Sequence, residues 1–281
     1  MIIFFEDGRL GNQLFQYSVI KKIYPEHRII FFGCEDLKKA LKSVEVTIVD
    51  KKKISTWLVV ILKYVMLACA RLRIIGMIRE SSKDKSLVIN EAVGIFFNVF
   101  LLSKSYFQHQ SMIKNISRNL DLNPSHVREA LRWLNESVND VGRERLVFIH
   151  IRRGDYLAWP TAKHPAVLDM QWYLNAMKQM RIWLKDPIFL VVTDDYTYAK
   201  KNFHQSSDVV ISKNSELIDL SIMSVCKHGI LSASSFSWWG AWFSRKNFPD
   251  GGIYIAPKYW AGHKEKKWLP VDFVTKWFIY S

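Results

Sequence analysis

Short apolar runs alternate with helix-like segments along most of the chain, and this alternation constrains the fold more than any other feature. Continuous apolar strands separated by helices are typical of parallel α/β sheets. We therefore predict two doubly wound, Rossmann-type halves that face a cleft, with ligands at the carboxyl ends of the strands. The predicted strands are residues 2–5, 29–33, 46–49, 146–151, 188–193, 209–211, 230–231 and 253–256. The predicted helices are residues 12–23, 37–41, 56–72, 125–136, 170–184, 198–203, 215–227 and 237–246.

The polar stretch of residues 119–145 separates the two predicted halves. An Asn-Pro pair begins a helix in this stretch, and the helix ends before an Asn-Asp-Val-Gly sequence. We place the boundary after residue 140, which gives domains of residues 1–140 and 141–281. Residues 51–98 carry no motif that we can assign.

The first candidate site follows the opening strand directly, at residues 8–13 (GRLGNQ). Gly8 and Gly11 let the backbone come close to a ligand, and Asn12 can cap a helix whose free N–H groups face an anion. The alternative is an ordinary tight turn between a strand and a helix.

The second site lies at residues 148–156 (FIHIRRGDY), where a buried strand runs into charged residues. Side chains alternate along a strand, so His150 and Arg152 share one face, and Arg153 points elsewhere unless the chain turns. The arginine fork matches phosphate oxygens. A surface ion-pair cluster or a chance adhesion tripeptide is the alternative, but adhesion tripeptides occupy exposed loop tips, whereas this one ends a core strand.

Two carboxylates, Asp194 and Asp195, follow the strand of residues 188–193. Acids in this position often cap the next helix, so the signal is weak by itself. The pair does not form an Asp-x-Asp motif, and none occurs in the chain, which disfavours a metal-bridged nucleotide-sugar site.

The fourth site follows a predicted helix that ends at His228, and it contains a serine-rich loop at residues 232–237. Hydroxyls and helix N-terminal amides bind anions without a metal. We expect His228 to be a helix-end residue rather than a catalyst, and the tryptophans that follow to pack in the core. These tryptophans are Trp238, Trp239 and Trp242.

The most apolar stretch, residues 57–70, is broken by Lys63 and is shorter than the roughly 20 residues needed to cross a bilayer. We expect a buried helix of the first half. The alternative is a helix resting on a membrane surface, with basic neighbours that would suit it: Lys51, Lys52, Lys53, Arg71 and Arg73. The net charge of +14 suits an anionic ligand, an anionic membrane or nucleic acid. We expect weak, salt-reversible contact with anionic membranes, without insertion, because the apolar face should be packed into the first domain.

Taken in order, these segments resemble the motifs of the α-1,2-fucosyltransferases of glycosyltransferase family 11. The resemblance rests on residues 8–16 (GRLGNQLFQ), 105–108 (SYFQ), 150–156 (HIRRGDY), 193–195 and 219–242. Two departures are Arg9, where the family usually has glycine, and Ala233, where it usually has asparagine. The resemblance implies a GT-B fold, GDP-L-fucose as donor, inversion at the anomeric carbon, a terminal β-galactoside as acceptor, and no metal or other cofactor.

The resemblance also implies roles for individual residues. His150 contacts guanine or its ribose, Arg152 binds the diphosphate, Asp219 reads guanine, and Ser235 holds phosphate. The second domain would bind the donor, and the first would be mainly on the acceptor side, with its opening loop reaching the donor. The full donor set is Gly11, Asn12, His150, Arg152, Arg153, Asp194, Asp219, Ser234 and Ser235.

Arg152 and Asp155 are the candidate catalytic residues. Charge on the leaving diphosphate must be met by fixed cations and oriented N–H groups if no metal takes part. Asp155 is our choice of general base over His164 and Asp169, which lie on the next loop.

Two other functions stay open: a basic nucleic-acid-binding protein and an inactive scaffold of the same fold. The first lacks a recognisable nucleic-acid-binding module, and the intact residues 150–155 argue against the second. Since we see no signal-anchor helix, we expect a bacterial cytoplasmic enzyme at the inner face of the membrane. It would build O-antigen or a related glycan, on an acceptor that can be lipid-linked.

Overall fold

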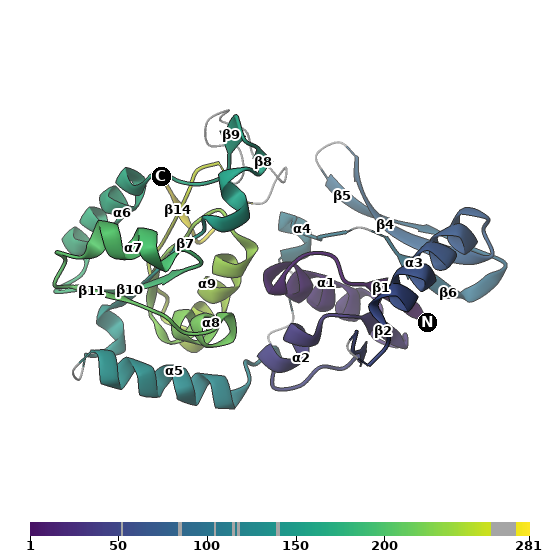
Figure 1. Ribbon diagram of the computed structural model, residues 1–281, viewed down its shortest axis with the longest axis horizontal. Coiled ribbons are helices and arrows are strands. Elements are labelled where there is room, and N and C mark those ends of the chain that lie inside the picture. Colours follow the sequence, from purple (N-terminus) through teal and green to yellow (C-terminus); the bar gives the residue numbers. More distant parts are fainter. Residues whose placement is uncertain are drawn as a thin grey trace. The chain divides into compact units, whose positions relative to one another are not determined.

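The computed structural model describes residues 1–51, 53–83, 86–103, 105–113, 116, 119–138, 141–259 and 274–281. The chain forms two compact units, Met1–Asp121 and Leu122–Ser281 (Figure 1). They divide before helix α5 (Pro124–Ser137) rather than after residue 140, because α5 packs against α8 (Glu216–Val225) of the second unit. The Asn-Pro start of this helix is confirmed, since the Asn123 side chain accepts a hydrogen bond from the Ser125 amide.

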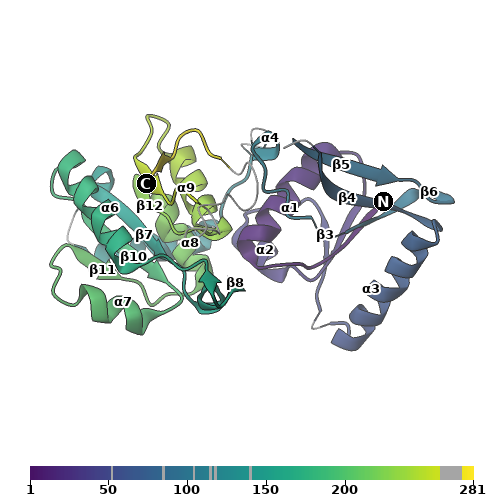
Figure 2. The same cartoon turned by 90° about the horizontal axis from the view of Figure 1, so that it is seen from above.

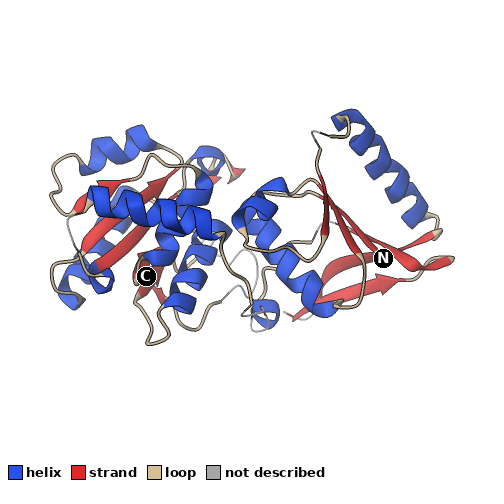
Figure 3. Ribbon diagram, turned by 90° about the horizontal axis from the view of Figure 1, so that it is seen from below, coloured by secondary structure: helices blue, strands red, loops and turns tan. Residues whose placement is uncertain are grey.

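The first unit is built on a six-stranded sheet in the order β3-β2-β1-β6-β4-β5. β1 is fully buried and pairs in parallel with β2 and β6. Helix α1 and helix α3 lie on opposite sides of this sheet (Figure 3). The elements are β1 (Ile2–Phe5), α1 (Leu10–Ile23), β2 (Ile29–Phe32), α2 (Glu35–Ala40), β3 (Thr47–Val49), α3 (Thr56–Arg71), β4 (Ile75–Lys83), β5 (Ser86–Ala92), β6 (Phe96–Leu102) and α4 (Gln110–Ile113).

The sequence did not predict strands β4, β5 and β6. β4 and β5 form an antiparallel hairpin at the sheet edge, in register from Met77 opposite Ala92 to Lys83 opposite Ser86. Polar residues such as Arg79 and Asn90 face each other across this hairpin and interrupt the apolar pattern of a buried strand. The first sheet is therefore mixed rather than purely parallel.

The prediction that α3 is buried is wrong. Only Val59 and Ala70 of this helix are buried, and they pack on Ile3, Phe5 and Leu101 of the sheet. The rest of the helix is largely exposed because a single helical face contacts the sheet. Among the described residues, no helix is long and apolar enough to cross a membrane.

The second unit is built on an all-parallel sheet in the order β11-β10-β7-β12-β13-β14. Val147 and Ile149 pack under Met177 of α6 and Phe203 of α7, so these two helices cover one face. His150, on the opposite face, lies beside Phe236 of α9. The main elements are β7 (Leu146–Ile151), α6 (Met170–Trp183), β10 (Ile188–Thr193), α7 (Tyr196–Phe203), β11 (Val209–Ile211), β12 (His228–Ile230), α9 (Ser235–Asn247), β13 (Tyr254–Ala256) and β14 (Ile279–Tyr280).

Helices thus cover both faces of this sheet (Figure 2), and the predicted α/β, GT-B-like fold class with two Rossmann-type units is confirmed. Short elements complete the unit: the 3-10 turns Arg143–Arg145 and Gly154–Leu157, and the small hairpin of β8 (Pro160–Thr161) and β9 (His164–Pro165).

The sequence predicted that His228 ends a helix, and this prediction is wrong. α8 stops at Val225, and His228 begins β12 in the sheet. Its Nδ1 accepts the Ile253 amide at 2.9 Å and its Nε2 lies 3.0 Å from the Glu144 carbonyl oxygen. Burial lowers the pKa of His228, so a neutral ring links the strands. The role is structural, as we expected, although the element is different.

Candidate active site

The second unit gathers polar residues at the carboxyl ends of four adjacent strands. β7 leads to Arg152, β10 to Asp194, β11 to Ser212 and β12 to Ser232. The parallel register, with Val192 opposite His150, brings these ends to one edge. The position agrees with the prediction that ligands lie where the strands end.

Arg152 is held between two carboxylates. Its Nη1 lies 2.9 Å from Asp194 Oδ2, and its Nη2 pairs with Asp155. The arginine side chain is 12% exposed, whereas that of Asp155 is 60% exposed. A guanidinium has five N–H donors, so Arg152 keeps donors for a further anion while the carboxylates fix its orientation. The structure thus brings together three predicted site residues.

Arg153 is directed away from Arg152, toward helix α7. Its Nε donates to Asp195 at 3.0 Å, and its guanidinium lies 3.6 Å from the centre of the Tyr198 ring. Asp195 also accepts the Tyr198 amide and caps α7; this hydrogen bond is the main reason that the pKa of Asp195 is lowered. The chain turns after Ile151, so the Arg153 backbone amide, rather than its side chain, contacts Asp194. In this arrangement Arg153 supports the loop.

The serine-rich loop packs against the end of β7. His150 is 4% exposed, and its Nδ1 lies 2.7 Å from Ser232 Oγ. The Tyr156 hydroxyl donates to the Ala233 carbonyl at 2.9 Å, and burial raises the pKa of Tyr156 to about 12. The protonated tyrosine therefore ties the Arg152 loop to the serine-rich loop across the sheet edge.

Helix α9 begins directly after this loop, at Ser235, two residues before the predicted start. The Ser234 hydroxyl accepts the Phe236 amide at 3.3 Å and caps the helix. Ser237 anchors the loop from below by donating to the carbonyls of Ser232 and Ser234. The loop thus presents the positive end of a helix dipole close to His150. Trp238 and Trp239 are fully buried, which confirms their predicted core role.

Asp219 is a buried carboxylate on α8, only 7% exposed. Ser212, at the end of β11, donates its hydroxyl to Asp219 Oδ1 at 2.5 Å. Burial raises the pKa of Asp219 to about 7, with Glu216 adding to the rise and Ser212 opposing it. An acid with this pKa can exchange its proton near neutral pH, or keep its charge when N–H donors approach.

The opening loop of the first unit differs in detail from the prediction. α1 begins at Leu10, so Gly11 and Asn12 lie inside its first turn and Asn12 is not the cap. The Asn12 amide donates to the Arg9 carbonyl, and its side-chain oxygen accepts from Gln108 at 2.7 Å. Gly8 has a φ of +89°, which its lack of a side chain permits.

Two buried glutamines brace the same loop. Gln13 donates to Glu6 and to the Gly8 carbonyl, and Gln16 donates to the carbonyls of Asp7 and Ser105. The segment of residues 105–108 therefore packs on the turn at Gly8 and the first turns of α1. Glu80, which accepts the amides of Tyr106 and Phe107, completes this arrangement.

Sequence reasoning missed Ser212, Tyr156 as a link between loops, and Tyr198. Ser212 follows a predicted strand, so the rule that identified Asp194 could also have found it. Nothing in the sequence around Tyr198 indicated its role, because its partner Arg153 comes from a distant part of the chain. Within the described residues, no three His, Cys, Asp or Glu side chains group as a metal site.

The chain resembles known glycosyltransferases in sequence and in fold. The profile of Glycosyl transferase family 11 matches residues 89–279. The α-1,2-colitosyltransferase of Escherichia coli is 30% identical over 213 residues, which cover 69% of each chain. The O-antigen biosynthesis glycosyltransferase WbnK of Escherichia coli is 35% identical over 129 residues, which cover 44% of this chain and 42% of WbnK.

A solved structure shares the fold at low sequence identity. The crystal structure of NodZ α-1,6-fucosyltransferase soaked with GDP-fucose superposes with a TM-score of 0.52 at 12% identity. The match covers 85% of this chain and 91% of NodZ. The predicted resemblance is thus confirmed by the family match and the relatives, and the fold by this structure: the chain belongs to glycosyltransferase family 11.

Proposed function

We propose that this enzyme transfers L-fucose from GDP-fucose to the 2-hydroxyl of a terminal β-galactoside, with inversion and without a metal ion. The observation that carries the proposal is Arg152, oriented by Asp155 and Asp194 at a strand end beside His150 and the start of α9. This arrangement offers a fixed cation and a helix N-terminus to a diphosphate.

The donor's base and phosphates would use different parts of the strand edge. Asp219, buried next to Ser212, offers a carboxylate that can accept hydrogen bonds from guanine N–H groups. His150 would contact guanine or its ribose. Ser234 and Ser235, at the start of α9, would hold phosphate together with Arg152. The donor complex of NodZ supports this choice of nucleotide sugar.

In the reaction, the bond between the fucose anomeric carbon and the phosphate oxygen breaks, and the electron pair leaves with GDP. Arg152 and the α9 amides stabilise the charge that builds up on the diphosphate. The acceptor hydroxyl attacks from the opposite face of the sugar and loses its proton to a base. Asp155 is our proposed base. Its exposed carboxylate can be reached by an acceptor, although its pairing with Arg152 also fits a positioning role.

The linkage and the biological role rest on the relatives. The names of the two Escherichia coli relatives indicate α-1,2 linkage and O-antigen biosynthesis. They support a role in bacterial O-antigen or related glycan synthesis. The β-galactoside acceptor, which can be lipid-linked, is the one that the family resemblance implies. The colitosyltransferase makes GDP-colitose the competing donor to test.

The deciding experiment is incubation of the enzyme with GDP-fucose or GDP-colitose and a panel of β-galactosides, followed by linkage analysis of the product. We expect a fucosylated product linked to the galactose 2-position, and a higher kcat/KM with GDP-fucose. A product linked elsewhere, or a preference for GDP-colitose, would overturn the corresponding part of the proposal. Donor hydrolysis without acceptor distinguishes an active enzyme from an inactive scaffold.

A further inference from the structure

Helix α3 of the first unit exposes an apolar face that no described part of this unit covers. The exposed fractions are 61% for Trp57, 50% for Ile61, 68% for Tyr64 and 51% for Val65. Soluble proteins rarely leave so continuous an apolar surface in water, and such surfaces mark contacts with proteins or membranes. None of these residues belongs to the sheet edge at which we place donor binding.

Helical geometry separates the two sides of α3. At 100° per residue, most of the exposed apolar residues fall within an arc of about 120°, along a helix about 24 Å long, and the exposed Val60 and Leu62 lie just beyond its two margins. We call this arc the outer face; it comprises Trp57, Leu58, Ile61, Tyr64, Val65, Ala68 and Leu72, the residue after the helix. It contains no charged residue.

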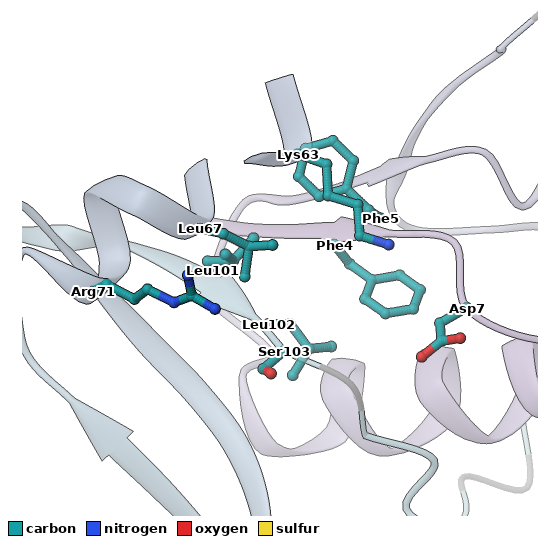
Figure 4. A pocket seen from close by; sticks show the side chains of 9 residues that line it. All are labelled: Phe4, Phe5, Asp7, Lys63, Leu67, Arg71, Leu101, Leu102 and Ser103. Atoms are coloured by element: carbon teal, nitrogen blue, oxygen red, sulfur yellow. The ribbon is translucent and has the colours of Figure 1, made fainter. Parts of the chain in front are cut away.

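Lys63, which interrupts the apolar run in the sequence, lies on the inner side of the helix. With Leu67 and Arg71, it lines a cavity of about 240 Å³ between α3 and the sheet, whose floor includes Phe4 and Leu101 (Figure 4). The sequence break at Lys63 is therefore no break in the exposed face. Arg71 borders the outer face instead of interrupting it.

The apolar surface continues past the end of the helix. The amides of Ile95 and Phe96 donate to the carbonyls of Arg73 and Ile74, which places the turn before β6 beside Leu72. Leu72 is 70% exposed and Ile95 is 69% exposed. The surface is thus made of a helix and an adjoining turn, both on the first unit.

The charges on α3 and on the segments that flank it in the sequence are of one sign. Residues 51–79 contain seven lysines and arginines and no aspartate or glutamate. Lys53, Arg71 and Arg73 are exposed at the two ends of the helix. Basic residues that flank an apolar strip favour an anionic lipid surface, and Trp57 and Tyr64 are residue types that settle at such an interface.

We infer that the outer face of α3 docks the protein on an anionic lipid bilayer. The helix lies in the plane of the membrane, its apolar side chains reach the boundary between headgroups and acyl chains, and the basic residues contact the lipid phosphates. This inference does not depend on which sugar the enzyme transfers. It replaces the expectation that the apolar face is buried and that insertion is absent.

Vesicle flotation tests the inference with full-length protein. The vesicles are phosphatidylcholine alone or phosphatidylcholine with phosphatidylglycerol, each at low and high salt. The key variant is Ile61→Asp, in the middle of the outer face. The matched control is Ile182→Asp on α6 of the second unit, which replaces a side chain that is 72% exposed. Thermal unfolding and transfer to a soluble acceptor verify that both variants are folded.

We expect the unmodified protein and Ile182→Asp to float with anionic vesicles, and Ile61→Asp to partition about tenfold less, since a carboxylate is repelled from the apolar boundary. High salt should weaken the binding without abolishing it, because the apolar contact is not screened. Equal flotation of Ile61→Asp would overturn the inference. So would a concentration-dependent dimer that Ile61→Asp dissociates and that does not float, because a second copy would then cover the face.

Discussion

Arg152 Nη1 lies 2.9 Å from Asp194 Oδ2, and the other oxygen of the same carboxylate accepts the backbone amide of Arg153 at 2.8 Å. One aspartate therefore fixes both the guanidinium and the loop that carries it. A bound diphosphate meets an arginine whose orientation is set before the donor arrives, so little ordering cost remains.

Replacing Arg152 by alanine should reduce kcat about a hundredfold to a thousandfold, because the charge on the leaving diphosphate loses its fixed cation. Arg152→Lys should recover only part of the loss, since lysine keeps the charge without the planar fork. The measurement is transfer from GDP-fucose together with thermal unfolding. Arg181→Ala is the matched control. Arg181 pairs with Asp208, away from the carboxyl ends of the strands, so the loss of the Arg181 side chain should leave kcat unchanged. Normal turnover by a folded Arg152→Ala protein would contradict the assignment.

Gly154→Ala should disturb the ion pair between Arg152 and Asp194 by displacing the carboxylate. A Cβ at Gly154 would lie 2.7 Å from Asp194 Oδ2, so the carboxylate must move away from Arg152. We expect kcat to fall about tenfold with a smaller change in KM, because Arg152 stays in place but loses its orientation. Steady-state kinetics tests this. Asp194→Asn should lower kcat in the same way, whereas the control Asp208→Asn should not. An unchanged kcat for both Gly154→Ala and Asp194→Asn would show that Asp194 does not position Arg152.

The strands at the catalytic edge could be predicted from the sequence because they are buried on both faces. β7 and β10 have the predicted bounds, and their continuous apolar residues are typical of strands that are buried on both faces. Asp194 and Arg152 could then be placed at one edge, since neighbouring parallel strands end together. Their ion pair could not be predicted, because Arg152 and Asp194 are 42 positions apart and meet only through the register of the sheet.

The errors have a common physical origin. A residue type indicates which local structure it favours. The structure that it adopts also depends on partner residues elsewhere in the chain. Asn12 suits a helix cap, but α1 begins at Leu10, and the Asn12 side-chain oxygen accepts a hydrogen bond from Gln108. Lys63 breaks an apolar run in sequence, but the helix turns it inward, away from the exposed face. The polar residues of β4 pair with those of β5, which the apolar pattern did not reveal.

Chelation should leave the reaction unchanged. If Arg152 and the N-terminus of α9 meet the charge of the diphosphate, the enzyme needs no Mg²⁺ or Mn²⁺. The test measures transfer after dialysis against EDTA, with and without added divalent ions. Loss of activity in EDTA that Mg²⁺ or Mn²⁺ restores would refute the metal-independent mechanism while leaving the donor assignment open.

Asp219 should make donor binding depend on pH near neutrality. Its pKa is raised to about 7 by burial, and the charged form accepts guanine N–H groups. The affinity for GDP should therefore rise as the pH increases through about 7. Calorimetric titration with GDP at several pH values measures the midpoint. Ser212→Ala should move the midpoint up, because the hydroxyl stabilises the carboxylate, and Glu216→Gln should move it down, because Glu216 repels it. A midpoint that neither variant moves would mean that another group controls binding.

The same raised pKa predicts a cost in stability. The folded protein keeps a proton on Asp219 that the unfolded chain has already lost above its usual value of 3.8. Stability from this group is therefore present at low pH and is lost as the pH rises toward 7, by about 4 kcal/mol at most. Asp219→Asn removes this pH-dependent loss of stability, because the amide does not ionise. Its oxygen can still accept a hydrogen bond from the Ser212 hydroxyl. We expect the variant to unfold at a higher temperature than the unmodified protein at pH 8, with a smaller difference at pH 5, and to bind GDP poorly at both. Equal unfolding temperatures at pH 8, or a lower one for the variant, would show that the buried carboxylate is stabilised by contacts that offset its burial.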